Sequence, residues 1–167
     1  MALTSRSITA IKRGFVITLC AALVCGAQAF ANPVVQENWS TYRVDGRDAG
    51  AILNQMAQRG PNGFWAYTTW FVRWTADCQV TVDIQYTMPQ HTRPSALPEN
   101  LRVRWAWMHA NLIRHERKHG QHGINAAQEL VTKRCRNGNS IIQKWANEDR
   151  RLDQRTRHGQ TEGVVFP

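Results

Sequence analysis

The chain has 167 residues, of which 43% are hydrophobic and 20% charged, and it carries a formal net charge of +9. This length suits one compact domain, and neither an internal repeat nor a low-complexity segment points to a solenoid or a linker. A basic protein can associate with an anionic envelope surface, but no run of basic residues interleaved with aromatics supports binding of nucleic acid.

Residues 1–31 have the layout of a secretory signal peptide. Three basic residues and no acidic one accompany an apolar run from Gly14 to Gly26, and small residues follow up to Ala31. The run is shorter than the roughly 20 residues of a membrane-spanning helix, although an uncleaved anchor is the alternative. Cleavage after Ala31 predicts a secreted or periplasmic protein in which residues 32–167 form a single, monomeric domain.

The first half of this domain predicts a short helix and two strands. Apolar residues at helical spacing predict a helix over residues 48–58, which Gly60-Pro61 ends. From Phe64 to Trp74, bulky apolar residues occur at both odd and even positions, which predicts a strand that is covered on both sides. Strict alternation from Cys78 to Thr87 predicts a strand with one buried face, and the short connection favours an antiparallel hairpin.

The second half predicts two helices. Pro98 fits the first turn of a long helix that extends to about Lys133. After the break at Asn137-Gly138-Asn139, Ser140 caps a last helix that ends near Asp153. We therefore expect an α+β fold, in which a small antiparallel sheet packs against one long helix accompanied by a C-terminal helix.

Cys78 and Cys135 are the two cysteines that lie beyond the signal peptide. An even number of cysteines in an exported domain predicts a disulfide, because export delivers the chain to an oxidising compartment. The alternative, in which both thiols bind zinc, has no support from their spacing.

The long helix carries the motif H-E-x-x-H at residues 115–119. Histidines at positions i and i+4 share one face of a helix and can bind one zinc ion, with the glutamate placed to deprotonate a zinc-bound water. His115 and His119 are therefore candidate Zn²⁺ ligands, and Glu116 is the candidate general base.

The sequence before the motif strengthens this interpretation. Leu101, Trp105, Met108 and Leu112 follow one another at helical spacing and mark the inward face of the helix. The same spacing continues with His115, His119 and His122. Imidazoles at core positions need a hydrogen-bonding or metal partner, which packing alone does not provide.

A catalytic zinc site usually has a third protein ligand, and the residue pattern leaves four candidates for it. His122 lies too far along a straight helix to converge easily with the first two histidines. Glu129 and Glu148 are carboxylate candidates from helices, whereas His158 lies in a loop after the last helix. Asp153 is a candidate for orienting a ligand histidine.

The chain also resembles a family of bacterial proteins classed as predicted secreted zinc-dependent proteases, a domain of unknown function. The resemblance covers nearly the whole mature chain and includes Tyr42-Arg43-Val44-Asp45-Gly46, the H-E-x-x-H pair, both cysteines and the closing D-x-x-T-x-H-G at residues 153–159. It implies export, a zincin-like site and peptidase activity. The closing motif favours His158 as the third ligand.

The sequence thus predicts an exported Zn²⁺-dependent metallopeptidase that acts on a peptide or protein substrate. Two alternatives from other classes are a non-catalytic zinc-binding module of the periplasm or envelope, and a basic envelope-binding protein with a chance motif.

Overall fold

The computed structural model describes residues 32–167. The predicted signal peptide lies outside these residues. Within the described part of the chain, every helix is too short or too polar to span a membrane.

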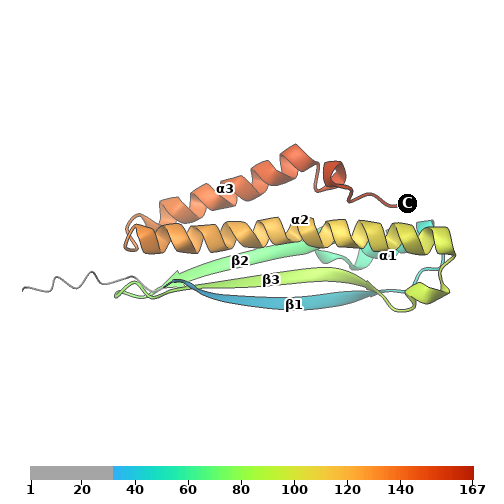
Figure 1. The fold of residues 1–167 in the computed structure, drawn as a ribbon, viewed down its shortest axis with the longest axis horizontal. Helices are drawn as coiled ribbons and strands as arrows, with labels where there is room; N and C mark the ends of the chain where they lie inside the picture. The colour runs from blue at the N-terminus through green and yellow to red at the C-terminus, as the bar shows by residue number, and fades with distance from the viewer. Residues whose placement is uncertain (1–31) are drawn as a thin grey trace, which may run out of the picture.

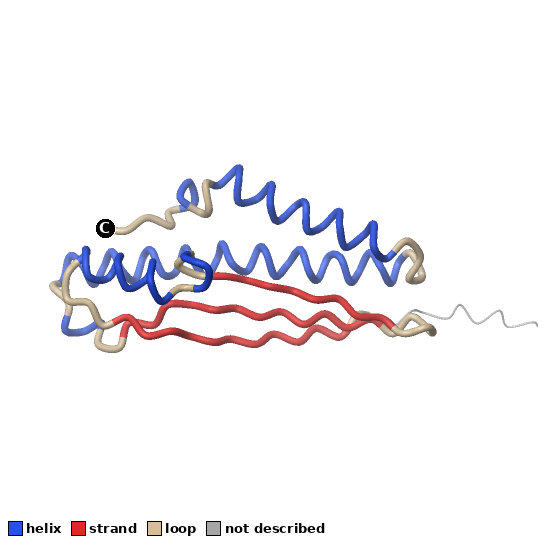
Figure 2. The backbone as a smooth tube through the Cα atoms, turned by 180° about the vertical axis from the view of Figure 1, so that it is seen from behind, coloured by secondary structure: helices blue, strands red, loops and turns tan. Residues whose placement is uncertain are grey.

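The domain has three layers, with the long helix α2 between a β-sheet and the C-terminal helix α3 (Figure 1). The view from behind shows the same order of layers (Figure 2). The elements are β1 (Val34–Val44), α1 (Ala49–Arg59), β2 (Tyr67–Trp74), β3 (Val80–His91), α2 (Glu99–Thr132) and α3 (Gly138–Thr156), with short 3₁₀ turns at Pro61–Gly63, Pro94–Ala96 and Gln160–Glu162. This arrangement confirms the predicted α+β class with a small sheet, a long helix and a C-terminal helix.

The sheet is mixed, with the strand order β1-β3-β2. The predicted hairpin is present, because β2 pairs antiparallel with β3. The first strand, β1, pairs parallel with β3 and was not predicted. Nearly every residue of β1 is exposed, so this strand lacks the buried face whose alternation identifies a strand in a sequence.

The prediction that residues 64–74 form a strand covered on both sides is wrong. β2 lies at an edge of the sheet, and helix α2 covers one of its faces. Trp70 and Val72 pair with the buried Ile84 and Val82, whereas Phe71 on the other face is 61% exposed. Because apolar residues occur on both faces of β2, the sequence could not distinguish an edge strand from a central one.

The buried residues form two clusters along α2. The first joins the N-terminal half of α2 to α1 and to the chain end at Val164 and Phe166. The second joins the C-terminal half of α2 to β3 and to Ile141 of α3. The H-E-x-x-H motif lies between these clusters, where the buried face of α2 changes from Leu112 to histidine as predicted.

Two glycines let α2 approach the sheet closely beside the motif. A Cβ atom built on Gly120 would lie 2.0 Å from the hydroxyl oxygen of Tyr86, and one on Gly123 would lie 2.8 Å from Trp70. Any side chain at these positions would push the helix away from the sheet. The glycines therefore set the depth at which the motif is buried.

The predicted disulfide between Cys78 and Cys135 is present. It links the turn between β2 and β3 to the loop between α2 and α3. Since α3 begins directly after this loop, the disulfide restrains the position from which α3 folds back along α2.

Candidate functional site

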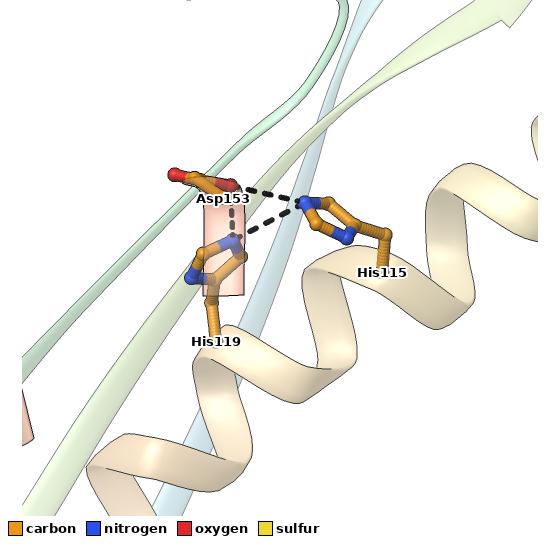
Figure 3. Close-up of side chains that lie close together, drawn as sticks. All are labelled: His115, His119 and Asp153. Carbon is orange, nitrogen blue, oxygen red and sulfur yellow. Dashed lines mark hydrogen bonds and ion pairs between the residues drawn. The ribbon is translucent and has the colours of Figure 1, made fainter. Parts of the chain in front are cut away.

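Three side chains from two helices converge at the middle of the domain (Figure 3). His115 and His119 come from α2 and are buried, and Asp153 reaches them from α3. The Oδ1 atom of Asp153 lies 3.2 Å from Nε2 of each histidine, and the two Nε2 atoms are 3.4 Å apart. These three atoms, each of a type that can bind a metal ion, form an almost equilateral triangle.

The size of this triangle fits a zinc ion. Zinc binds imidazole nitrogen and carboxylate oxygen at about 2.0–2.1 Å, so neighbouring donors of a tetrahedral site lie about 3.3 Å apart. All three separations are close to that value. Two imidazoles and one carboxylate are also a donor set found in catalytic zinc sites, in which the fourth position is open to water.

A second carboxylate holds each histidine through its other ring nitrogen. Nδ1 of His115 lies 3.1 Å from Glu162, and Nδ1 of His119 lies 3.0 Å from Asp149. A carboxylate that accepts the Nδ1 proton fixes the tautomer that leaves Nε2 free to bind a metal. Both imidazoles are therefore oriented with their donor atoms toward Asp153.

Further contacts hold these outer carboxylates in place. The indole nitrogen of Trp70 donates to Asp149 at 2.6 Å, and Lys118 pairs with Glu162 at 2.6 Å. The first contact comes from β2, and the second comes from the same helix as the motif. The geometry of the donors thus depends on the sheet, both long helices and the chain end.

The electrostatics of the cluster favour positive charge at the donor atoms, whether as protons on the imidazoles or as a bound cation. Burial by itself lowers the pKa of His119, but hydrogen bonds with Asp149 and Asp153 outweigh this effect and raise it to about 10. Burial by itself raises the pKa of each of these two carboxyl groups, yet hydrogen bonds from the imidazoles lower both. Carboxylates therefore stay ionised next to the imidazole nitrogens and attract positive charge.

Glu116 is buried and lines the same cavity as the three donors. The hydroxyl of Thr68 on β2 donates a hydrogen bond to its carboxylate at 2.6 Å. Burial raises the pKa of Glu116, although this hydrogen bond opposes the shift. A carboxyl group with a raised pKa is typical of general bases in enzymes.

His119 and His122 also form a group with Asp149, but its geometry is that of hydrogen bonds. Both histidines contact the same oxygen of Asp149 through Nδ1, and the contact from His122 is 2.6 Å long. That separation is short for two ligands of one tetrahedral zinc ion, which lie about 3.3 Å apart. His122 therefore supports Asp149.

The other sequence-predicted candidates take different positions. His158 lines the cavity, but its side chain is 62% exposed and its Nδ1 lies 3.6 Å from Asp153. Glu129 binds Lys144 and Trp145, and Glu148 pairs with Arg151, so neither carboxylate is brought to the motif. The geometry therefore favours Asp153 for the third position, a residue that the sequence pattern suggested only as an orienting group.

Sequence reasoning missed Asp149 and Glu162. Asp149 and Asp153 are four residues apart on α3, so they face α2 together, and this i, i+4 pair of acids is a signal that could have been recognised. Glu162 lies beyond the last helix, in a 3₁₀ turn. Its approach to His115 depends on the course of the chain end, which no local pattern indicates.

The donors and Glu116 open into a cavity of about 440 Å³. Its walls come from the segment that leads into β2, from α2, from α3 and from the chain end. Besides the donors and Glu116, the lining includes Phe64, Tyr67, Thr68, Arg150 and His158. A cavity of this volume is within the range of small-ligand sites and could accept part of a peptide.

The chain belongs to a family of bacterial proteins of unknown function (DUF922), whose model matches residues 39–159. The match includes the motif, Asp149, Asp153 and His158, whereas Glu162 lies beyond it. Comparison with curated proteins and with solved structures finds no match.

Proposed function

We propose that this protein is a zinc-dependent metallopeptidase in which His115, His119 and Asp153 hold the ion and Glu116 is the general base. The observation that carries the proposal is the triangle of donors, with separations of 3.2, 3.2 and 3.4 Å, in the same cavity as a buried glutamate. The resemblance of the sequence to predicted secreted zinc-dependent proteases supports the same function.

A bound zinc ion would polarise the scissile carbonyl and lower the pKa of its bound water to about 7. The protein's own residues supply the proton transfers and the orientation. Glu116 accepts a proton from the attacking water and passes it to the leaving nitrogen, while Thr68 keeps the carboxylate in place. Asp149 and Glu162 hold the two imidazoles in the tautomer that this chemistry requires.

An extended peptide is the substrate that fits the surroundings of the site. β2 pairs with β3 along one edge, and among the described residues no strand pairs with its other edge. Thr68, near the start of β2, contacts Glu116, so a peptide added to the free edge would pass beside the site. Backbone hydrogen bonds to β2 would then place a peptide bond next to Glu116.

The proposed location is the periplasm or the exterior of the cell. The disulfide between Cys78 and Cys135 is of the kind that persists in an oxidising compartment. The layout of residues 1–31 supports the same location, because it predicts a cleaved signal peptide.

Replacement of Glu116 by Gln separates the proposal from the non-catalytic alternative. We expect purified E116Q to bind one zinc ion per chain as the unchanged protein does, and to lose hydrolysis of a mixed peptide library by a factor of 10² or more. Peptide cleavage is followed by mass spectrometry. A zinc-loaded wild-type protein that cleaves neither library peptides nor cell-wall peptides would instead identify a zinc-binding module.

A further inference from the structure

We propose that Arg150 forms a subsite for a carboxylate of the substrate, next to the metal-binding donors. The inference rests on the proposed peptidase function and names the class of peptide that the site prefers. The carboxylate could belong to an acidic side chain or to the C-terminus of the peptide, since both present the same planar anion.

Arg150 stands out among the residues that line the cavity. It is the single Lys or Arg in that lining, where Glu116, Asp149 and Asp153 supply three carboxylates. On α3, Arg150 precedes Asp153 by three residues, which places it about 60° around the helix and about 4.5 Å along its axis. Both residues line one cavity, so a group bound by Arg150 would lie in the cavity that contains the donors.

The guanidinium of Arg150 is not neutralised by the protein. Among the described residues its hydrogen-bonding partner is the side-chain amide of Asn147, and no carboxylate forms an ion pair with it. Neighbouring cations behave differently, because Arg151 pairs with Glu148 and Lys118 pairs with Glu162. Arg150 thus keeps its charge available although acidic residues line the same cavity.

A carboxylate is the ligand that matches this cation. Arginine presents its N–H groups as a planar fork, which binds carboxylates through two parallel hydrogen bonds. Bound zinc would offset part of the negative charge of the neighbouring carboxylates, and Arg150 is the one Lys or Arg side chain in the lining that adds positive charge beyond the ion. Arg150 would therefore decide whether an acidic substrate is accepted or rejected.

Two aromatic residues that also line the cavity, Phe64 and Tyr67, make no comparable contact. Phe64 and Tyr67 stack with their ring centroids 6.1 Å apart and are partly exposed. These rings can pack against an apolar part of a peptide, but they do not distinguish a carboxylate from an amide. Selection by charge is therefore expected from Arg150 on α3. Phe64→Ala should lower kcat/KM for acidic and neutral peptides by the same factor.

The test uses matched peptides and the full-length zinc-loaded protein. In the first kind of pair, the two peptides differ only by Glu or Gln at one position flanking the cleaved bond, and each flanking position is tested in turn. In the second kind, the two peptides differ only in ending in a free carboxylate or in an amide. We expect wild type to favour the carboxylate of at least one pair by about tenfold in kcat/KM, the size of one charge-assisted hydrogen bond. The pair that responds identifies the source of the carboxylate.

Arg150→Gln should reduce this preference to below about twofold, through a loss of kcat/KM for the carboxylate peptides and not through a change of kcat/KM for the neutral ones. Arg150→Glu should reverse it, so that a peptide with Lys is cleaved faster than one with Gln. Arg151→Gln is the matched control, since it removes one exposed positive charge from the next residue of α3 but should retain the preference. A wild type without preference, or a preference that survives in Arg150→Gln, would overturn the inference.

A binding assay keeps the outcome separate from the proposed function. Zinc-loaded E116Q should bind the labelled carboxylate peptide about tenfold more tightly than the amide or Gln peptide, measured by fluorescence anisotropy. Loss of this difference in E116Q/R150Q supports the subsite even if the wild type hydrolyses no peptide. Equal affinity for both peptides in E116Q contradicts the subsite, whatever the wild type hydrolyses.

Discussion

Replacement of Asp153 by Asn tests the assignment of the third zinc ligand. The substitution keeps the size of the side chain but removes its negative charge from a position 3.2 Å from both Nε2 atoms. Supporting residues around metal sites typically contribute 10–100-fold to metal affinity. As a direct ligand, Asp153 should contribute at least about 100-fold, which corresponds to roughly 2.7 kcal/mol.

The loss can be converted into a change in thermal stability. At a free zinc concentration of 100 times the wild-type Kd, bound zinc stabilises the folded chain by about 2.7 kcal/mol. A 100-fold weaker site would retain only about 0.4 kcal/mol under the same conditions. For a domain of about 136 residues, the difference corresponds to roughly 7–12 °C in Tm.

The assay is therefore a pair of thermal melts, with and without buffered zinc, supported by competition with a chromophoric chelator. Wild type should gain roughly 8–13 °C from zinc, and Asp153→Asn should gain about 2 °C or less. His158→Ala should keep most of the gain, since its imidazole is largely exposed and lies outside the triangle of donors. The zinc-dependent gain in Tm of Asp149→Asn should lie between those of Asp153→Asn and His158→Ala, because Asp149 acts on the metal site through His119.

The opposite order of effects would refute this reasoning. If His158→Ala lost the zinc-dependent gain in Tm while Asp153→Asn kept it, His158 would be the third ligand, as the closing sequence motif suggested. Asp153 would then only orient the imidazoles. Melts without zinc control for changes in the stability of the metal-free fold.

Four further predictions concern the fold and the proposed general base, Glu116. Gly120→Ala should lower the free energy of unfolding by about 1–3 kcal/mol, because its Cβ would lie 2.0 Å from the Tyr86 hydroxyl, whereas Gly50→Ala on the exposed side of α1 should cost nothing measurable in urea titrations. Replacement of both Cys78 and Cys135 by Ser should cost about 4 kcal/mol in the same assay, since the disulfide closes a separation of 57 residues, and an unchanged urea midpoint would contradict this. Thr68→Val should leave zinc affinity intact but lower kcat by about tenfold or more, because Glu116 loses a charge-assisted hydrogen bond; equal activity would show that Thr68 does not position the base. Burial, assisted by Glu37, raises the pKa of Tyr86 to about 12, so its contribution to stability is complete below pH 10 and is lost as the pH rises through about 12; Tyr86→Phe should show a smaller decline over that range.

Much of the fold could be predicted from local patterns. The alternation in β3, the helical spacing in α2 and the short turn before Cys78 each depend on residues close together in the chain. β1 escaped prediction because it lies at a sheet edge and buries almost none of its residues. The coverage of β2 was predicted wrongly, because apolar side chains on both faces do not reveal which face meets a helix.

The sequence by itself determined the pair His115 and His119, the neighbouring Glu116 and the pairing of the two cysteines. Helical spacing alone places the two imidazoles on one face, and residues 32–167 contain two cysteines, so only one pairing is possible within that part of the chain. Only the tertiary structure decided which residue completes the triangle of donors. Asp153 reaches His115 because α3 folds back along α2, and Glu162 reaches it because the chain end continues along α2, where Gly163 contacts Asn111. Such approaches depend on how whole helices pack, so contacts between residues far apart in the chain leave no periodic signal in the sequence.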